Sequence, residues 1–329
     1  MKIPCLKVSK KEAEKVRRKL IEKNLLLKGY RVERDENFVY FPVKEDVEFE
    51  NYKIVYREMK KVGKKSYEDV LKEKGIDLES ISIDFIGDIA IIRLNDKSIA
   101  KEVADAIMKT NKHIKTVCID KGVKEDYRIR DIEIVAGKKK TETMHIEYGL
   151  KIKLDIAKVY FSPRLSTERM RVAKQVKENE IVIDMFAGVA PFSLLIAKVA
   201  KPKKIYAIDI NPVAVKYAIE NVKLNKMDDI IEVVEGDAKD ILPNLPDADH
   251  VIMNLPHKSF NFLPLALEKG KILHYYEIME RKKIEERVEK IKRKAEKEGY
   301  EVEIKNVRVV GSYSPSKQKI GMEIYRLNS

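Results

Sequence analysis

Short apolar runs alternate with amphipathic stretches along the sequence from about residue 160 onward. The runs predicted to be strands are Ile181–Asp184, Lys204–Asp209, Ile231–Glu235, His250–Met253 and Lys271–Tyr276. Helices are predicted between them at about 192–200, 213–225 and 261–269. Repeated strand–helix order predicts a parallel sheet, because each crossover to a neighbouring parallel strand needs a connection that covers one face. The fold class of this part is therefore α/β.

The end of the chain departs from that order. A charged helix at about 280–298 is followed by two strand-like runs, 300–308 and 319–327, joined by a loop. Strands joined directly in this way pair antiparallel. Residues 161–329 are therefore predicted to form a mostly parallel sheet with an antiparallel edge.

The residues before this domain are predicted to form two small α+β modules. In the first, residues 1–60, Ser9 is expected to cap a helix, with Glu12 completing a capping box. The strands predicted in this module are Ile3–Val8, Asn37–Val43 and Tyr52–Tyr56. The charged segment Met59–Lys65 lacks apolar periodicity and is predicted to be a linker.

The second module is predicted over residues 66–160. It begins with helix Tyr67–Lys74 and a strand pair, Ile83–Leu94, broken near Gly87. The amphipathic segment Ser98–Lys109 predicts another helix. Four further strands are predicted at about 114–119, 128–135, 142–147 and 150–155. The chain is thus expected to have three parts.

Composition limits the class of protein. The 67 lysine and arginine residues exceed the 54 aspartate and glutamate residues, so the net charge of +13 favours a polyanionic partner, nucleic acid first. The two cysteines, Cys5 and Cys118, are too few for a disulfide framework or a cysteine-based zinc site, and no metal is predicted. No apolar run is long enough for a transmembrane helix or a secretory signal. We expect a cytoplasmic protein.

Three acidic residues end three successive predicted strands: Asp184, Asp209 and Asp237. Open α/β sheets bind ligands beyond the carboxyl ends of their strands. Asp209 follows Asp184 by 25 residues, near the spacing at which an acid accepts hydrogen bonds from a ribose. Asp237 is placed to accept from an adenine amine, and Asp184 would favour a cationic group. The alternative is that each acid is only a polar strand end or a helix cap.

The turn after the first of these strands contains Gly188, which allows a ligand close to the backbone. The full G-x-G-x-x-G pattern is absent, so a dinucleotide pyrophosphate is not favoured. The set of acids and this turn resemble class I S-adenosylmethionine-dependent methyltransferases over about 160–329. Many members of that class have a second glycine where this chain has Ala190.

The resemblance implies a Rossmann-like fold and S-adenosylmethionine as cofactor. Asp209 would hold the ribose, Asp237 the adenine, and the turn from Asp184 to Gly188 the methionine end. The full set of residues that it places around the cofactor is Tyr160, Asp184, Phe186, Gly188, Asp209, Ile210, Asn211, Asp237, Ala238, Asn254 and Pro256.

A further motif, Asn254-Leu255-Pro256-His257, follows the fourth predicted strand. Methyltransferases that act on exocyclic amines often carry Asn/Asp-Pro-Pro-aromatic at this place. The leucine and histidine weaken an exocyclic amine as acceptor and leave a ring nitrogen open. His257 could contact a base or be structural.

The segment Val159–Arg171 precedes the cofactor domain and reads VYFSPRLSTERMR. Ser166 or Thr167 can cap a helix here, which places Glu168 in the first turn. A lone acid among arginines suits an anionic substrate that must lose one proton. The alternative is a capped surface helix with ion pairs between neighbouring turns.

Together these motifs resemble the archaeal and eukaryal tRNA (guanine-N1)-methyltransferases, which modify position 37. The match extends upstream to Tyr127–Asp131 and covers most of 66–329, with a looser match before that. The resemblance implies tRNA as partner, contacted at the anticodon loop and outer corner, and a monomeric enzyme that does not bind membranes. It implies catalytic roles for Glu168 as base, Arg128 at the guanine oxygen and Asn254 at the base edge. The implied substrate-binding residues are Arg128, Arg164, Arg169 and His257.

Three alternatives stay open from the sequence. The enzyme could also C-methylate a wyosine precursor, 4-demethylwyosine, at the same position. It could transfer an aminocarboxypropyl group in the wyosine pathway. It could be a noncatalytic tRNA-binding protein, although the joint presence of Glu168, Asp209, Asp237 and Asn254 opposes this.

Overall fold

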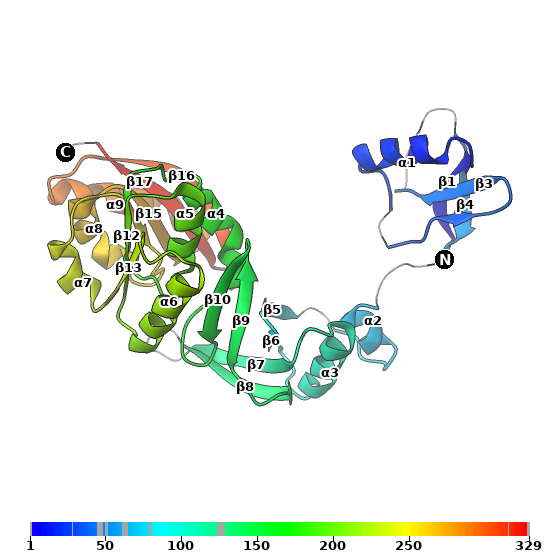
Figure 1. Cartoon of the computed structure of the whole chain (residues 1–329), viewed down its shortest axis with the longest axis horizontal. Helices are drawn as coiled ribbons and strands as arrows, with labels where there is room; N and C mark the ends of the chain where they lie inside the picture. Colours follow the sequence, from blue (N-terminus) through cyan, green and yellow to red (C-terminus); the bar gives the residue numbers. More distant parts are fainter. Residues whose placement is uncertain are drawn as a thin grey trace. The chain divides into compact units, whose positions relative to one another are not determined.

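The structure is a computed structural model that describes residues 2–27, 29–44, 49, 52–60, 65–78, 81–123, 129–314 and 316–327. The chain divides into two compact units, Met1–Leu78 and Glu79–Ser329 (Figure 1). Within the described ranges, no helix is both long and apolar enough to cross a membrane.

The first unit contains a sheet in the order β2-β3-β1-β4. Its elements are β1 (Lys2–Ser9), α1 (Ala13–Glu22), β2 (Glu33–Arg34), β3 (Phe38–Pro42), β4 (Ile54–Glu58) and α2 (Tyr67–Lys72). The predicted capping box at Ser9 is wrong. Ser9 remains in β1, paired with Phe38, and its hydroxyl donates to Glu12 instead of accepting from the helix. Because Ser9 is paired in the sheet, α1 begins only at Ala13.

The second unit begins with a sheet in the order β5-β6-β7-β8 and a hairpin. The elements are β5 (Ser82–Ile86), β6 (Ile89–Arg93), α3 (Ala100–Thr110), β7 (Thr116–Val123), β8 (Arg130–Gly137), β9 (Glu142–Glu147) and β10 (Leu150–Asp155). Ile89 and Ile91 of β6 belong to the same hydrophobic core as Leu194 and Leu195 of the following domain. This shared core explains why residues 79–160 of the second predicted part lie in one compact unit with the third, whereas α2 lies in the first unit. The predicted three-part division stays a prediction.

The C-terminal sheet has the order β13-β12-β11-β14-β15-β17-β16. Its strands are β11 (Ile181–Asp184), β12 (Lys204–Asp209), β13 (Ile231–Glu235), β14 (Ala248–Met253), β15 (Gly270–Met279), β16 (Val302–Ser312) and β17 (Gln318–Arg326). Pairing is parallel from β13 to β15, and β17 and β16 are antiparallel to their neighbours. The predicted mostly parallel sheet with an antiparallel edge is therefore confirmed.

Helices cover both faces of this sheet. They are α4 (Ser166–Ala173), α5 (Pro191–Ala200), α6 (Pro212–Leu224), α7 (Ala238–Ile241), α8 (Leu263–Lys269) and α9 (Ile284–Lys297). Val182 packs in a core with α5 and α6, whereas its neighbour Ile183 packs in a second core with α8 and α9. Alternate residues of a strand face opposite sides, so burying both requires a helical layer on each face. The short helix α7 was not predicted.

Candidate active site

The loop after β11 lies among the carboxyl ends of its neighbouring strands. The amide of Ala187 donates to the carbonyl of Ile208, 2.8 Å away, and that of Met185 donates to Ile252, 3.1 Å away. Gly188 has φ of +57° and Ala190 has φ of +64°, both in the left-handed region. An alanine tolerates this region at some cost in backbone strain. The turn is thus left-handed at Ala190, the position at which the resemblance noted from the sequence suggests a second glycine.

Asp184, at the end of β11, is almost fully buried. Its Oδ2 accepts from the hydroxyl of Ser193 at 2.9 Å, while its Oδ1 has no hydrogen-bond partner in the described part of the chain. Burial raises the pKa of this carboxyl to about 7. A buried acceptor without a partner is costly and is a candidate for a ligand contact.

Asp209, at the end of β12, holds two loops together. Its Oδ2 accepts from the amide of Gly188 at 2.6 Å, and its Oδ1 accepts from the amide of Asn211 at 2.9 Å. Burial raises its pKa despite these hydrogen bonds. Asn211 caps α6 through the amide of Val213, so its side chain has a structural task. Ile210 between them is 53% exposed and offers an apolar surface at the sheet edge.

Asp237 caps α7 by accepting from the amide of Lys239 at 2.9 Å. The capping role considered as the alternative is therefore present, and a contact with adenine stays a prediction. Ala238 is buried beside it. Phe186 packs edge-on against Phe262, with ring centroids 5.0 Å apart. Phe186 follows β11, and Asp237 and Ala238 follow β13, so these residues lie at the same edge of the sheet as Asp184 and Asp209.

Asn254 follows β14, and its Oδ1 accepts from the Nζ of Lys319 on β17 at 2.6 Å. Lys319 is only 8% exposed, and its ammonium lies 5.3 Å from the centre of the Tyr276 ring. Pro256 is buried, whereas His257 is exposed and its ring packs edge-on against Tyr313. The amide of Asn254 is therefore held by a buried cation from another strand.

Glu168 lies in the first turn of α4 and is 7% exposed. Its carboxylate accepts from Arg171 at 2.8 and 3.0 Å, from Arg308 at 2.6 and 3.2 Å, and from the hydroxyl of Tyr276 at 2.7 Å. Burial by itself would raise the pKa of Glu168, but these hydrogen bonds outweigh it and lower the pKa to about 2. The same two arginines also contact Glu323, which is fully buried.

The predicted cap of α4 is wrong. A 3₁₀ turn at Pro163–Leu165 runs directly into the helix, so Ser166 is its first residue and no side chain caps it.

The predicted role of Arg169 in binding the substrate also needs correction. Its side chain is 1% exposed and pairs with Glu147 at 2.8 and 2.5 Å, and it also donates to the carbonyl of Ser162. Its guanidinium is buried in the protein and cannot meet a substrate directly. Arg169 fixes the turn that precedes α4. The sequence pattern missed this because the partner, Glu147, is distant in the chain.

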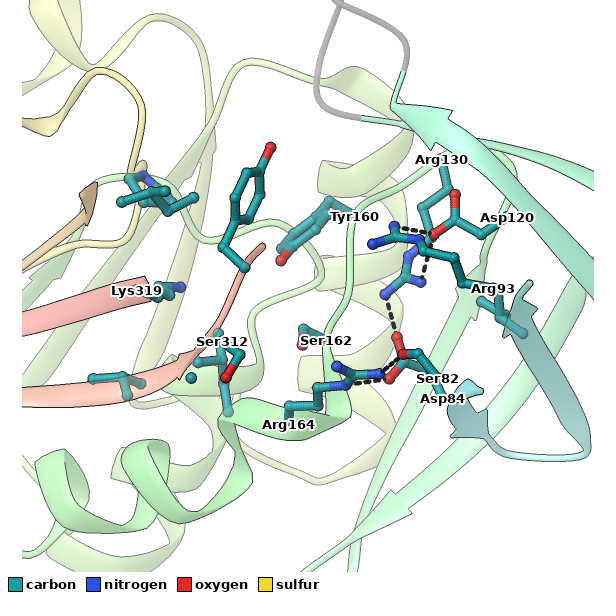
Figure 2. A pocket seen from close by; sticks show the side chains of 17 residues that line it. Ser82, Asp84, Arg93, Asp120, Arg130, Tyr160, Ser162, Arg164, Ser312 and Lys319 are labelled. Carbon is teal, nitrogen blue, oxygen red and sulfur yellow. Dashed lines mark hydrogen bonds and ion pairs between the residues drawn. The ribbon is translucent and has the colours of Figure 1, made fainter. Parts of the chain in front are cut away.

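A pocket lies between the β5–β8 sheet, the turn before α4 and the β16–β17 edge (Figure 2). Tyr160, Arg164, Pro256 and Lys319 are among the residues that line it. Glu168 is outside its described lining and is linked to it through Tyr276 and Lys319. Arg128 lies outside the described residues.

An alternating network of charges forms one side of the pocket, across from Lys319 (Figure 2). Arg93 donates to Asp120 at 2.7 Å, and Arg130 bridges Asp120 at 3.4 Å and Asp84 at 2.7 Å. Arg164 continues the network with a 2.6 Å hydrogen bond to Asp84 and a second to Ser82. The network joins the second predicted module to the turn before α4.

Comparison with known proteins agrees with this arrangement. The family described as "TRM5/TYW2 methyltransferase domain" matches residues 143–303. The "tRNA methyltransferase 5 N-terminal domain" matches 5–52, and the "TYW2 N-terminal domain" matches 64–141. A tRNA (guanine(37)-N(1))-methyltransferase, Trm5b of Pyrococcus abyssi, is 41% identical over 97% of this chain and 98% of its own length. The chain belongs to the TRM5/TYW2 methyltransferase family.

Solved structures of this family support the same conclusion. The complex of aTrm5 with tRNALeu is 36% identical, has a TM-score of 0.71 and matches 98% of this chain and 99% of its own. TYW2 of Methanocaldococcus jannaschii, solved with S-adenosylmethionine, is 33% identical, has a TM-score of 0.58 and matches 75% of this chain and 100% of its own. The expected family, Rossmann-like fold, enzyme class and cofactor are therefore confirmed.

The family also includes enzymes that transfer an aminocarboxypropyl group, which is one of the alternatives left open by the sequence. A tRNA(Phe) (4-demethylwyosine(37)-C(7)) aminocarboxypropyltransferase of M. jannaschii is 38% identical over 70% of this chain and 92% of its own length.

Several residues of this site were missed by the sequence analysis. They are Asp84, Arg93, Asp120, Tyr276, Arg308, Lys319 and Glu323. They are polar or charged residues of β5, β6, β7, β15, β16 and β17, and the residues with which they interact lie far away in the sequence. Such a residue is ordinarily solvent-facing, so the local pattern carries no signal for a shared site.

Proposed function

We propose that this enzyme transfers a methyl group from S-adenosylmethionine to N1 of guanine at position 37 of tRNA. The similarity to Trm5b over almost the whole of both chains supports the proposal most strongly. It includes residues 5–52, which match the N-terminal domain of tRNA methyltransferase 5, whereas the aminocarboxypropyltransferase aligns with only 70% of this chain. Methyl transfer to guanine is therefore favoured over aminocarboxypropyl transfer.

The cofactor supplies an electrophilic methyl group. Asp209, Asp237 and the Asp184–Gly188 turn are the residues that would hold it, with the free Oδ1 of Asp184 suited to a cationic group. Tyr160, Phe186, Ile210 and Pro256 would supply apolar contacts. This fit rests on acceptors that already lie at one sheet edge and on the left-handed turn that keeps the backbone accessible.

Guanine N1 carries a proton that must leave. We assign its removal to Glu168, whose carboxylate is ionised at every physiological pH because its pKa is about 2. Such a weak base suffices if the proton leaves as the bond to carbon forms, because the nitrogen then becomes strongly acidic. The assignment requires that Arg308, Arg171 or Tyr276 gives up its hydrogen bond to Glu168 when the base enters.

Other groups would orient the base and stabilise charge on it. Asn254, fixed by Lys319, would hold the base edge. Arg128 would stabilise negative charge on the guanine oxygen. His257 and Arg164 would contact the flanking nucleotides. A base in an anticodon loop is stacked, so it must be extruded to reach this pocket.

The rest of the chain would dock the tRNA. We propose three functional parts, with residues 1–60 at the outer corner of tRNA, 66–160 beside the anticodon loop and 161–329 for catalysis. We further propose a monomer that works in the cytoplasm, in keeping with two buried free cysteines and a net charge of +13.

Mass analysis of nucleosides tests the function. The protein is incubated with S-adenosylmethionine and an unmodified tRNA transcript, with an A37 transcript as control and a tRNA that carries 4-demethylwyosine in parallel. We expect 1-methylguanosine from the G37 transcript alone. An aminocarboxypropyl product on the wyosine precursor, without methylguanosine, would overturn the proposal. Methylation of both G37 and the precursor would add the dual activity to it.

A further inference from the structure

We propose that Arg93 and Arg164 form a clamp for two backbone phosphates of the RNA strand that carries the target base. This inference rests on the function proposed above. Both arginines line the pocket, and their side chains are 57% and 51% exposed. Their positions at the two ends of the charged network are visible in Figure 2.

Two buried carboxylates preorganise the clamp. Asp120 holds Arg93, and Asp84 holds Arg164; their side chains are 3% and 7% exposed. Arg130, at 12% exposure, ties the two carboxylates together and is itself shielded from solvent. A long arginine side chain that is already fixed loses less conformational entropy when it binds. The exposed ends of the network are thus prepared for a ligand, and its centre is structural.

The charge balance of the pocket favours an anion. Arg93, Arg130, Arg164 and Lys319 oppose Asp84 and Asp120, so positive charge remains in excess. A guanidinium has five N–H donors, and the described contacts use only Nη2 of Arg93 and only Nε and Nη2 of Arg164. The remaining donors suit the paired oxygens of a phosphodiester.

The clamp also answers a mechanical need of the reaction. Extruding a stacked base costs a few kcal/mol, and contacts with the flanking backbone can offset that cost. Tyr160 and Pro256, which are assigned above to the cofactor, line the same pocket as the two arginines. The base that receives the methyl group would therefore be bound next to the arginines that hold its flanking phosphates. Phosphate contacts fix the register of the strand without reading its sequence.

The test measures the affinity of the full-length protein for unmodified tRNA as a function of salt. Each phosphate contact on single-stranded RNA contributes about 0.7 to the slope of log K against log[salt]. We expect Arg93→Gln and Arg164→Gln each to lower the slope by about 0.7. Arg281→Gln, an exposed arginine outside the pocket, is the matched control and should leave the slope unchanged. Unchanged slopes in both pocket variants would overturn the clamp.

A second measurement separates phosphate binding from a structural effect. Anticodon stem-loops with one neutral methylphosphonate linkage beside nucleotide 37 are bound to wild type and to each variant. If an arginine contacts that phosphate, neutralising the linkage weakens wild type but adds no loss to the variant. Additive losses at every flanking linkage would show that the arginines only maintain the fold, and would overturn the clamp. Absence of methylguanosine with wild type would instead refute the underlying function.

Discussion

The ammonium of Lys319 lies 2.6 Å from Oδ1 of Asn254. This hydrogen bond joins the end of β14 to β17, the antiparallel strand on the far side of β15. Lys319 also approaches the ring of Tyr276, whose hydroxyl donates to Glu168. The residue proposed to hold the base edge and the residue proposed to take its proton are therefore linked by two intervening side chains.

Replacing Lys319 tests this link. Lys319→Met keeps an unbranched side chain as far as Cε but removes the donor that fixes the Asn254 amide. We expect the single-turnover methyl-transfer rate to fall by about 10- to 100-fold with little change in tRNA affinity. The reason is that a small misplacement of the base slows the chemical step much more than it weakens the binding of the whole tRNA. Lys319→Arg should recover part of the rate. Lys317→Met, an exposed lysine two residues earlier, is the control. An unchanged rate in Lys319→Met would remove the residue from the mechanism.

Replacing Glu168 tests the proton acceptor. Glu168→Gln should retain cofactor and tRNA binding and lose about 10²-fold or more in single-turnover rate. Glu323→Gln removes the other carboxylate that shares Arg171 and Arg308, so it reports the cost of disturbing the cluster alone. We expect a much smaller rate loss in Glu323→Gln. Equal losses in the two variants would show that Glu168 acts through the cluster and not as a base.

The low pKa of Glu168 also predicts the shape of the pH profile. The carboxylate stays ionised as pH falls, until about 2. The methyl-transfer rate of wild type should therefore show no acidic limb from this group between pH 5 and pH 7. A limb that is present in wild type and disappears in Glu168→Gln would contradict the hydrogen-bond arrangement described above.

Asp184 should make cofactor binding depend on pH. Burial raises its pKa to about 7, so the free enzyme is partly protonated at neutral pH. A cationic group of the cofactor favours the ionised carboxylate, so binding must release that proton. We expect affinity for S-adenosylmethionine to fall by up to about tenfold per pH unit below 7 and to level off above it. Titration calorimetry at pH 6, 7 and 8 measures this, and Asp184→Asn should flatten the dependence.

A buried pair of histidines should make stability depend on pH. His250 on β14 and His274 on β15 stack with ring centroids 5.2 Å apart, and their nitrogens approach to 3.0 Å. Burial lowers the pKa of both, although Glu180 beside His250 opposes the shift there. The unfolded chain therefore takes up protons first as pH falls below about 6.5.

The free energy of unfolding should consequently decrease with falling pH, by up to about 1.4 kcal/mol per pH unit for each histidine. Urea unfolding between pH 7.5 and 5.5 measures the slope, and His274→Asn should reduce it whatever its effect at pH 7.5. A slope identical in wild type and variant would mean that the pair does not titrate in this window.

Glu168 affects stability in a separate pH window, because its pKa is lowered from 4.5 to about 2. Its contribution to the free energy of unfolding is complete above about pH 4.5 and is lost as the pH falls toward 2.

Much of the fold and of the cofactor edge could be predicted from the sequence. The strand–helix order predicts that β11, β12 and β13 are parallel, and parallel strands place their carboxyl ends at one edge. Asp184 and Asp209 end the first two of these strands, and Asp237 follows the third by two residues. The proline at the start of α6 and the apolar runs of β11 and β12 are local signals, and the structure has the helix and the strands where these signals predict them. Local signals failed where pairing competes with them, as at Ser9, which stays in β1 instead of capping α1.

Only the tertiary structure decided what the charged side chains do. Arg169 and Arg164 lie in the same motif, yet one is buried against Glu147 and the other remains half exposed beside Asp84. Their partners lie 22 and 80 residues away in the chain, and no periodicity encodes a pairing over such separations. Glu168 likewise owes its low pKa to Tyr276 and Arg308, which β15 and β16 bring to it. The sequence determined which residues could do the chemistry, and the packing of distant strands determined the charge and exposure of each.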